Sequence, residues 1–156
     1  CGTYFTCNDR ISEMRLTTHT DYALRTLMFL AATGRRATVA DVAQLYGISA
    51  NHIAKVVNQL VRLGYVRSIR GIGGGIELAC QPSDIPLGEI VKALEGNMHL
   101  LDCVATDDIC AIQSFCSLKG VLAEAERVQL EYLNTVTLAD VVPGKRQLGR
   151  VNASTL

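Results

Sequence analysis

Three of the chain's six cysteines lie close together, in the stretch CVATDDICAIQSFC at residues 103–116. Six residues separate Cys103 from Cys110, and five separate Cys110 from Cys116. Structural zinc sites usually place cysteines in close pairs and use four ligands, and disulfide pairing would leave one of the three thiols over. Thiolates on a loop also suit iron–sulfur ligation. We therefore predict an iron–sulfur site, with zinc and inert thiols as the alternatives.

A four-iron cluster needs a fourth ligand besides these three cysteines. The chain supplies several candidates, which are its other three cysteines, its three histidines and a number of carboxylates. Cys80 follows a predicted strand and is interpreted as an ordinary buried thiol. The residues by themselves leave the fourth ligand open.

Composition limits the class of protein and its location. Hydrophobic residues make up 49% of the 156 residues, but no apolar run reaches the roughly 18 residues that a membrane helix needs. The N-terminal stretch CGTYFTCNDRISE lacks the apolar segment of a secretory signal. We therefore expect a cytoplasmic protein without a membrane partner, in a reducing compartment where structural disulfides are rare. No nucleophile is grouped with a base, so we do not expect an enzyme.

Charge is uneven along the chain, although the formal net charge is zero. Residues 1–83 carry a net charge of +4, residues 84–140 carry −7 and residues 141–156 carry +3. No acidic residue lies between Asp41 and Glu77, whereas four basic residues do. This distribution predicts one surface that faces a polyanion and a separate part for assembly or sensing.

Two short helices separated by a glycine turn are predicted in TVADVAQLYGISANHIAKVVNQLVRLG at residues 38–64. They follow a helix that runs from Asp21 to Gly34. Thr38 and Ser49 are typical N-cap residues, and Gly47 allows the turn. On the last helix the apolar positions, expected to face inward, are Ile53, Val56, Val57, Leu60 and Val61. Its outward positions carry groups that suit base edges and phosphates, namely Asn51, His52, Lys55, Asn58 and Gln59. The pattern predicts a helix-turn-helix.

A hairpin wing is predicted next, in YVRSIRGIGGGIELA at residues 65–79. Arg67 and Arg70 supply positive charge, and the glycines, Gly73 among them, let the backbone approach a phosphate or enter a minor groove. Together with the helix-turn-helix and the acid-free window, the wing predicts duplex DNA binding. A purely structural three-helix core is the alternative interpretation.

The remainder of the chain has the pattern of an assembly part. PLGEIVKALEG at residues 86–96 predicts a helix that Gly96 ends, and a long helix is predicted from Ser117. The long helix carries one apolar stripe, formed by Leu118, Val121, Leu122, Ala125, Val128 and Tyr132. Such a stripe commonly packs against a second copy, and packing onto its own domain is the alternative.

The predicted fold class is mainly α with a small β-hairpin wing. Its parts are an N-terminal extension over residues 1–13, native or not, a winged helix-turn-helix domain over residues 14–82, a cluster-binding loop with a dimerisation helix over residues 83–142, and a flexible tail over residues 143–156.

Several stretches in one order resemble a known family. They are MRLTTHTDYALRTLMFLA at 14–31, the helix-turn-helix, RGIGGGIELA at 70–79, IPLGEIVKALEG at 85–96 and the three-cysteine loop. The combination resembles the Rrf2 family of winged-helix regulators over about residues 14–142, and within it the nitric-oxide-sensing repressors. The resemblance implies a homodimer with one iron–sulfur cluster on each subunit, held by Cys103, Cys110 and Cys116.

The resemblance also bears on the fourth ligand. In relatives that regulate iron–sulfur biogenesis a histidine closely follows the third cysteine, whereas here SLK follows Cys116. In nitric-oxide-sensing relatives the ligand can be an aspartate near the start of the first helix of the partner subunit. The matching residue here is Asp21, with His19 as second choice. The residues alone favour a plainer role, in which Asp21 lies in the first helical turn and pairs with Arg25. The first cysteine gap is longer than in many relatives; we expect a 4Fe–4S cluster, with 2Fe–2S as the alternative.

The resemblance implies a DNA-binding transcriptional repressor with operator DNA and a second copy as partners and nitric oxide as signal. A carboxylate is displaced more readily than a thiolate, so we hypothesise that nitric oxide attacks the cluster there and that nitrosylation or loss of the cluster releases DNA. The expected DNA contacts are Asn51, His52, Lys55, Asn58, Arg67, Arg70 and Gly73. The alternative is a regulator that responds to cluster supply or redox state and keeps its DNA in the presence of nitric oxide.

Overall fold

The computed structural model describes residues 16–96 and 98–144. Its elements are α1 (Thr18–Thr33), α2 (Val39–Tyr46), α3 (Ala50–Arg62), β1 (Val66–Ile69), β2 (Gly75–Leu78), η1 (Pro82–Asp84), α4 (Leu87–Glu95), α5 (Asp102–Ala105), η2 (Gln113–Phe115), α6 (Ser117–Asn134) and α7 (Leu138–Val141). The predicted class, mainly helical with a two-stranded hairpin, is confirmed. The N-terminal extension and residues 145–156 of the predicted tail lie outside the described residues. No helix within the described ranges is long and apolar enough to span a bilayer.

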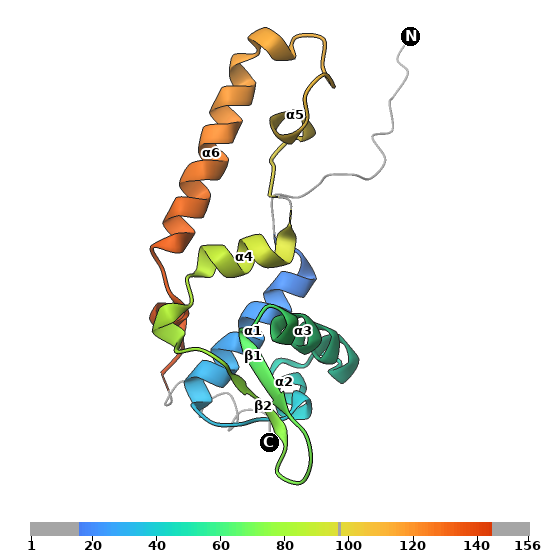
Figure 1. The fold of residues 1–156 in the computed structure, drawn as a ribbon, viewed down its shortest axis with the longest axis vertical. Helices are drawn as coiled ribbons and strands as arrows, with labels where there is room; N and C mark the ends of the chain where they lie inside the picture. The colour runs from blue at the N-terminus through green and yellow to red at the C-terminus, as the bar shows by residue number, and fades with distance from the viewer. Residues whose placement is uncertain (1–15, 97, 145–156) are drawn as a thin grey trace, which may run out of the picture.

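Two parts can be followed in Figure 1, and we call them the body and the arm. The body comprises residues 16–96 together with α7, and it contains α1 to α3, the hairpin and α4. The arm comprises residues 98–134, in which α6 rises away from α4 and the cysteine segment with α5 runs beside it. The predicted cysteine loop therefore lies at a distance from the helix-turn-helix in this chain.

The first helix begins at Thr18 and not at Asp21, where the apolar pattern placed its start. The cause is a cap, because the Thr17 side chain accepts a hydrogen bond from the Thr20 backbone N–H at 3.3 Å. The helix ends at Gly34 as predicted, and this residue has the left-handed φ of 59° that favours glycine.

The predicted helix-turn-helix is present as α2 and α3. Thr38 and Asp41 form a reciprocal capping box at the start of α2, and hydrogen bonds from Thr38 hold the pKa of the Asp41 carboxyl below its usual value. Ser49 caps α3 by accepting from the His52 backbone N–H. The expected inward residues of α3 are buried except for Val61, which is 37% exposed. That prediction was wrong for Val61, which lies at the edge of the apolar stripe and stays partly open to solvent.

The wing consists of residues 66–78, in which β1 and β2 pair antiparallel. The turn between the strands closes through a hydrogen bond from the Gly74 N–H to the Gly71 carbonyl at 2.9 Å. Gly73 occupies the turn with φ 76°, a conformation that other residues adopt at a cost. Ala37, in the loop between α1 and α2, forms a further antiparallel bridge with Ile76. The wing is thus joined to the rest of the body by backbone hydrogen bonds.

The hydrophobic core of the body draws on both ends of the chain. Its largest fully buried side chains include Leu27, Ile53 and Leu60 from the helical part and Ile85, Ile90 and Leu138 from beyond the hairpin. The core therefore continues across the predicted domain boundary at residues 82 and 83, and the division into domains stays a prediction.

Gly88 lies where α4 crosses α6, and the crossing joins the arm to the body. A side chain at Gly88 would collide with the Asn134 amide and would lie 3.0 Å from the Leu130 carbonyl oxygen. Beside the crossing, the Leu87 N–H donates to the Val136 carbonyl at 2.9 Å and the Leu138 N–H donates to the Ile85 carbonyl at 2.8 Å. The absence of a side chain thus allows the two helices to come this close.

Replacement of Gly88 by alanine is expected to destabilise the chain by about 1–3 kcal/mol, because the added methyl group overpacks the helix crossing. Gly120→Ala is the matched control, since Gly120 is also helical and, apart from its own helix backbone, no atom of the described residues lies within 4 Å of the added group. This second change should stabilise α6 by a few tenths to about 1 kcal/mol. Chemical unfolding of both variants measures the difference, and equal effects would contradict the close crossing.

Candidate cluster site and DNA-binding surface

The three cysteines of the arm carry free thiols. Cys103 lies in α5 and is partly buried, Cys110 is exposed, and Cys116 is the partly buried residue that precedes α6. As donors, three free thiols on one segment fit an iron–sulfur cluster, whose iron prefers soft sulfur ligands. Over residues 16–96 and 98–144, no three His, Cys, Asp or Glu side chains are gathered closely enough to hold a single metal ion. The described chain therefore supplies the donors without assembling them around one ion.

Gln113 organises the interior of the cysteine segment. Its Nε2 donates hydrogen bonds to the carbonyl oxygen of Cys103 at 3.0 Å and to that of Thr106 at 2.6 Å. Its Oε1 accepts from the Ile109 backbone N–H at 3.1 Å. One amide group thus links three backbone positions between the first and last cysteines. The segment has no hydrophobic core to hold it, so these polar contacts determine its shape.

Two charged contacts fasten this segment to α6. Glu126, on α6, accepts from the Leu100 backbone N–H at 2.7 Å and lies 2.8 Å from His99 Nδ1. Lys119 donates to the Asp107 carboxylate at 2.7 Å, and this contact lowers the pKa of Asp107. The segment is therefore held to α6 on both sides of Cys103.

Asp21 pairs with Arg25 one helical turn later, at 2.8 Å between Arg25 Nε and the carboxylate. Both side chains are 45% exposed, and the hydrogen bond to Asp21 raises the pKa of Arg25. This is the plainer role that the residues alone favoured. The described chain does not bring Asp21 together with the three cysteines in a group that could hold a metal ion. His19 Nε2 is buried without a hydrogen-bond partner among the described residues.

Cys80 is not the buried thiol that the sequence indicated. It is exposed, and its Sγ lies 3.8 Å from the Gly64 carbonyl oxygen. The apolar pattern of β2 ends at Leu78, and the chain then turns outward toward η1.

The expected DNA contacts on α3 share an exposed helix face. Asn51, His52, Lys55 and Asn58 are all exposed, whereas Gln59 is partly buried. The His52 ring lies against Tyr22 of α1, with a ring-centroid distance of 6.2 Å. The outer face of α3 thus presents polar groups in the arrangement that a recognition helix uses.

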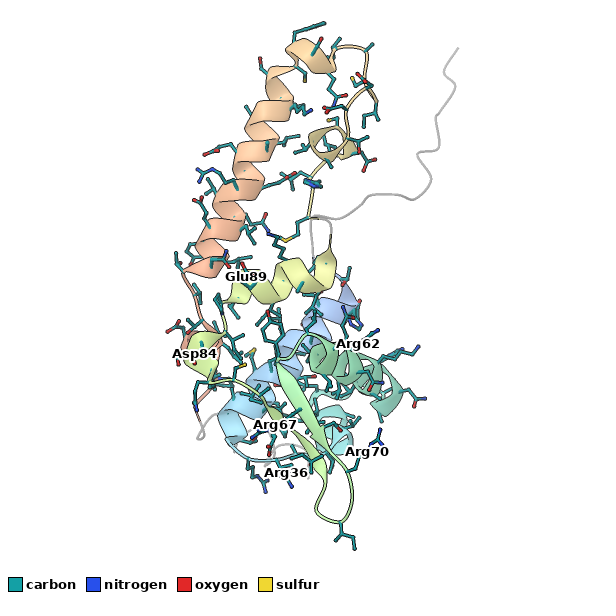
Figure 2. The ribbon with its side chains drawn as sticks, viewed as in Figure 1. Arg36, Arg62, Arg67, Arg70, Asp84 and Glu89 are labelled. Atoms are coloured by element: carbon teal, nitrogen blue, oxygen red, sulfur yellow. The ribbon has the colours of Figure 1, made fainter. Side chains whose placement is uncertain are left out.

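The basic residues of the wing differ in their surroundings. Arg67 donates to the Glu77 carboxylate at 2.6 Å, and this hydrogen bond lowers the pKa of Glu77. No ion pair to Arg70 is recorded within the described part of the chain. In the view of Figure 2, Arg67 lies to the left of the hairpin and Arg70 to its right. Of the two arginines, Arg70 is thus the one whose charge is not already paired with a carboxylate.

Sequence reasoning missed Ile72, which is fully exposed at the tip of the wing. An apolar residue between the turn glycines was the available signal. Such a side chain suits contact with the floor of a minor groove.

Comparison with known proteins identifies the family. The model of the Rrf2 family, described as an iron-dependent transcriptional regulator, matches residues 16–144. The HTH-type transcriptional regulator NsrR of Bacillus subtilis is 44% identical over 138 residues, which cover 86% of this chain and 94% of that protein. The NsrR of Shouchella clausii is 42% identical over 132 residues, which cover 83% and 89%.

The chain belongs to the Rrf2 family. It is a transcriptional regulator with a DNA-binding winged helix-turn-helix and not an enzyme. Among solved structures, CymR, the global cysteine regulator of B. subtilis, matches with a TM-score of 0.69 at 24% identity over 82% of this chain and 95% of its own. The T. potens IscR matches with a TM-score of 0.64 at 24% identity over 91% of both chains. These two likenesses establish the Rrf2 fold.

Replacement of Gln113 by glutamate is expected to loosen the cysteine segment, because a carboxylate accepts hydrogen bonds but cannot donate to the Cys103 and Thr106 carbonyls. Amide hydrogen exchange in cluster-free protein should accelerate over residues 103–113 by roughly tenfold or more, because two hydrogen bonds of about 1 kcal/mol each are lost. Ser114→Ala in the same turn is the control and should leave exchange unchanged. Equal exchange in both variants would contradict the role of Gln113.

Proposed function

We propose that this Rrf2 protein is a transcriptional repressor that responds to nitric oxide through an iron–sulfur cluster. The observation that carries the proposal is the set of three free thiols on one polar segment, in a chain 44% identical to an NsrR. The cluster would be held by Cys103, Cys110 and Cys116, and a 4Fe–4S form is favoured over a 2Fe–2S form. When bound, the cluster supplies iron that reacts with nitric oxide.

The fourth ligand is proposed to be Asp21 of the partner subunit. In support, Asp21 is partly exposed, and among the described residues its carboxylate is held by Arg25, a contact that it can exchange for another. His19 is the second choice, and its unpartnered, buried Nε2 is a reason to keep it. In either case the donor set would be completed by one residue of α1.

A homodimer is proposed because the apolar stripe of α6 remains uncovered in one chain. Leu118 is 55% exposed, Val121 63%, Val128 50% and Tyr132 68%. A contiguous row of large apolar side chains of this kind marks an interface. The helix has no buried residue to hold it against its own body, so a second copy is the better partner.

The two recognition helices of the dimer would read two half-sites about 34–36 Å apart on one face of the duplex. Asn51, His52, Lys55 and Asn58 would face bases and phosphates from α3, and Arg70 would enter the neighbouring groove from the wing. Since both half-sites must be met together, a change in the relative position of the two subunits weakens both contacts. The protein would act in the cytoplasm, where the bacterial chromosome is.

An anaerobic nitric oxide titration tests this function. The cluster-loaded protein is bound to a duplex that it has selected from a random pool, and absorbance, native mass and DNA binding are followed together. We expect a few equivalents of nitric oxide to change the absorbance and abolish DNA binding. Retention of DNA after the absorbance has changed would favour a regulator of cluster supply or redox state, and a colourless protein with bound zinc would contradict the cluster.

Asp21→Asn and His19→Gln separate the two candidates for the fourth ligand. Because an amide is a poor ligand for iron, Asp21→Asn should lower the cluster content or speed cluster loss under air by roughly tenfold, the effect typical of a changed metal ligand sphere. His19→Gln should not. Thermal unfolding of the cluster-free proteins controls for loss of the Asp21–Arg25 ion pair, and cluster loss in His19→Gln alone would reverse the assignment.

Replacement of Arg70 by alanine should weaken DNA binding roughly tenfold and lower the slope of log affinity against log salt by about one, since one phosphate contact is lost. Arg127→Ala removes the same charge from α6 and serves as the control. Fluorescence anisotropy at several salt concentrations measures both quantities. If affinity and slope stay at the wild-type values, Arg70 does not contact DNA.

A further inference from the structure

Glu77 is the only acidic residue between Asp41 and Asp84, and it lies on β2 of the wing, opposite Arg67. It faces Arg67 directly across the hairpin, in register, with Arg67 Nε 2.6 Å from its Oε1. Its other oxygen, Oε2, accepts from Arg36 Nε at 3.2 Å. The Glu77 side chain is 21% exposed. An acid at this place reduces the attraction of the wing for DNA, so its presence calls for a physical reason.

Arg36 uses its second nitrogen to reach the tip of the wing. Its Nη1 donates to the Gly73 carbonyl oxygen at 2.9 Å, within the turn that follows Arg70 and Ile72. One guanidinium therefore contacts both the carboxylate on β2 and the backbone of the turn. Lysine lacks this planar pair of donors and would have to reach both acceptors from one nitrogen.

The loop between α1 and α2, which carries Arg36, is also held to the wing by backbone hydrogen bonds. Ala37 N–H donates to the Ile76 carbonyl at 3.0 Å, and Ile76 N–H donates to the Ala37 carbonyl at 2.7 Å. Gly75 permits this approach, because a side chain there would lie 2.5 Å from the Ala37 carbonyl oxygen and 3.0 Å from Arg36 Cγ. The loop between α1 and α2 thus fixes β2, and Arg36 extends that hold to the turn.

We propose that Arg36, Glu77 and Arg67 form a clamp that positions the wing for DNA, so that the acidic Glu77 is required for tight DNA binding. Arg67 then acts through Glu77 as a positioning residue and is not a phosphate contact. The proposal rests on DNA binding by the winged helix-turn-helix and is independent of the proposed response to nitric oxide. Figure 2 shows Arg36 and Arg67 on the same side of the hairpin, away from Arg70.

We expect the clamp to strengthen DNA binding by keeping the wing ordered in the absence of DNA. Exposed ion pairs contribute little to the free energy of unfolding, and Arg67 and Arg36 are 65% and 40% exposed. A wing that moves freely, however, must be ordered each time it enters a groove, and this ordering weakens binding. A small set of contacts between the loop and the turn removes that cost before DNA arrives.

Glu77→Gln separates the clamp from simple electrostatics because the two predict opposite signs. Loss of an acid next to DNA should strengthen binding if Arg36 and Arg67 are phosphate contacts that Glu77 partly neutralises. The clamp instead predicts weaker binding, by roughly three- to tenfold, the range expected for ordering one or two side chains on binding. Asp84→Asn is the matched control, because it removes the same charge from η1, outside the clamp.

Arg36→Lys keeps the charge but replaces the planar guanidinium, whose Nε and Nη1 reach Glu77 and the Gly73 carbonyl separately, by one ammonium nitrogen. The clamp predicts a loss of affinity similar to that of Glu77→Gln, with an unchanged salt slope. Arg35→Lys, at the preceding position, is the matched control and should bind as the wild type does. In the double variant Arg36→Lys/Glu77→Gln the two losses should not add, since both remove the same set of contacts.

The affinities are measured by fluorescence anisotropy on a selected duplex in the absence of nitric oxide, and thermal unfolding confirms that each variant is folded. Binding by Glu77→Gln as tight as that of Asp84→Asn, or tighter, would overturn the clamp. Binding by Arg36→Lys equal to that of Arg35→Lys would overturn it as well. Arg36→Lys decides the matter alone if Glu77→Gln does not fold.

Discussion

The close crossing of α4 and α6 at Gly88 sets the position of the arm relative to the body. α4 packs on α1 through the shared core, and just after α6 the Val136 carbonyl accepts a hydrogen bond from the Leu87 N–H at the start of α4. The start of α1 is tied to the end of α4, because Glu95 accepts from the Thr17 backbone N–H at 2.8 Å. A displacement of α6 at this crossing would therefore be transmitted to α4 and to the start of α1, which also carries Asp21.

The body was the part that local sequence patterns could predict. Each of its first three helices has a threonine or serine cap and a period of apolar residues, and these are signals that span only a few positions. Val61 shows the limit of such signals, because apolar periodicity does not tell whether another element covers the edge of the stripe. The start of α1 differed for another reason, because the cap at Thr17 lies several residues before Leu24, where the apolar period begins. The continuation of the core through Ile90 and Leu138 depends on contacts between distant segments.

The candidate site too could be predicted from the sequence only in part. The number and type of its sulfur ligands are visible in the sequence, but the contacts that shape their segment are polar and follow no period. Gln113 and Glu126 could not be distinguished from other polar residues before the structure placed them. The contact between Arg67 and Glu77 is partly predictable, because the register of the hairpin places the two residues opposite each other. The contact of Arg36 with Glu77 is not, because 41 positions separate these residues in the chain. Long-range polar contacts are thus the features that required a structure.

No described residue of the arm is buried, and this separates its energetics from those of the body. Its order in one chain rests on helix formation in α6 and on exposed hydrogen bonds, each of which contributes little. In the proposed dimer the remaining free energy would come from the second copy on α6 and from ligand bonds at the cysteines. A segment whose order depends on its ligand loses that order with it, because binding and folding are then one equilibrium. Because the body has a core of its own, the proposed loss of the cluster would change the arm and leave the recognition helices folded.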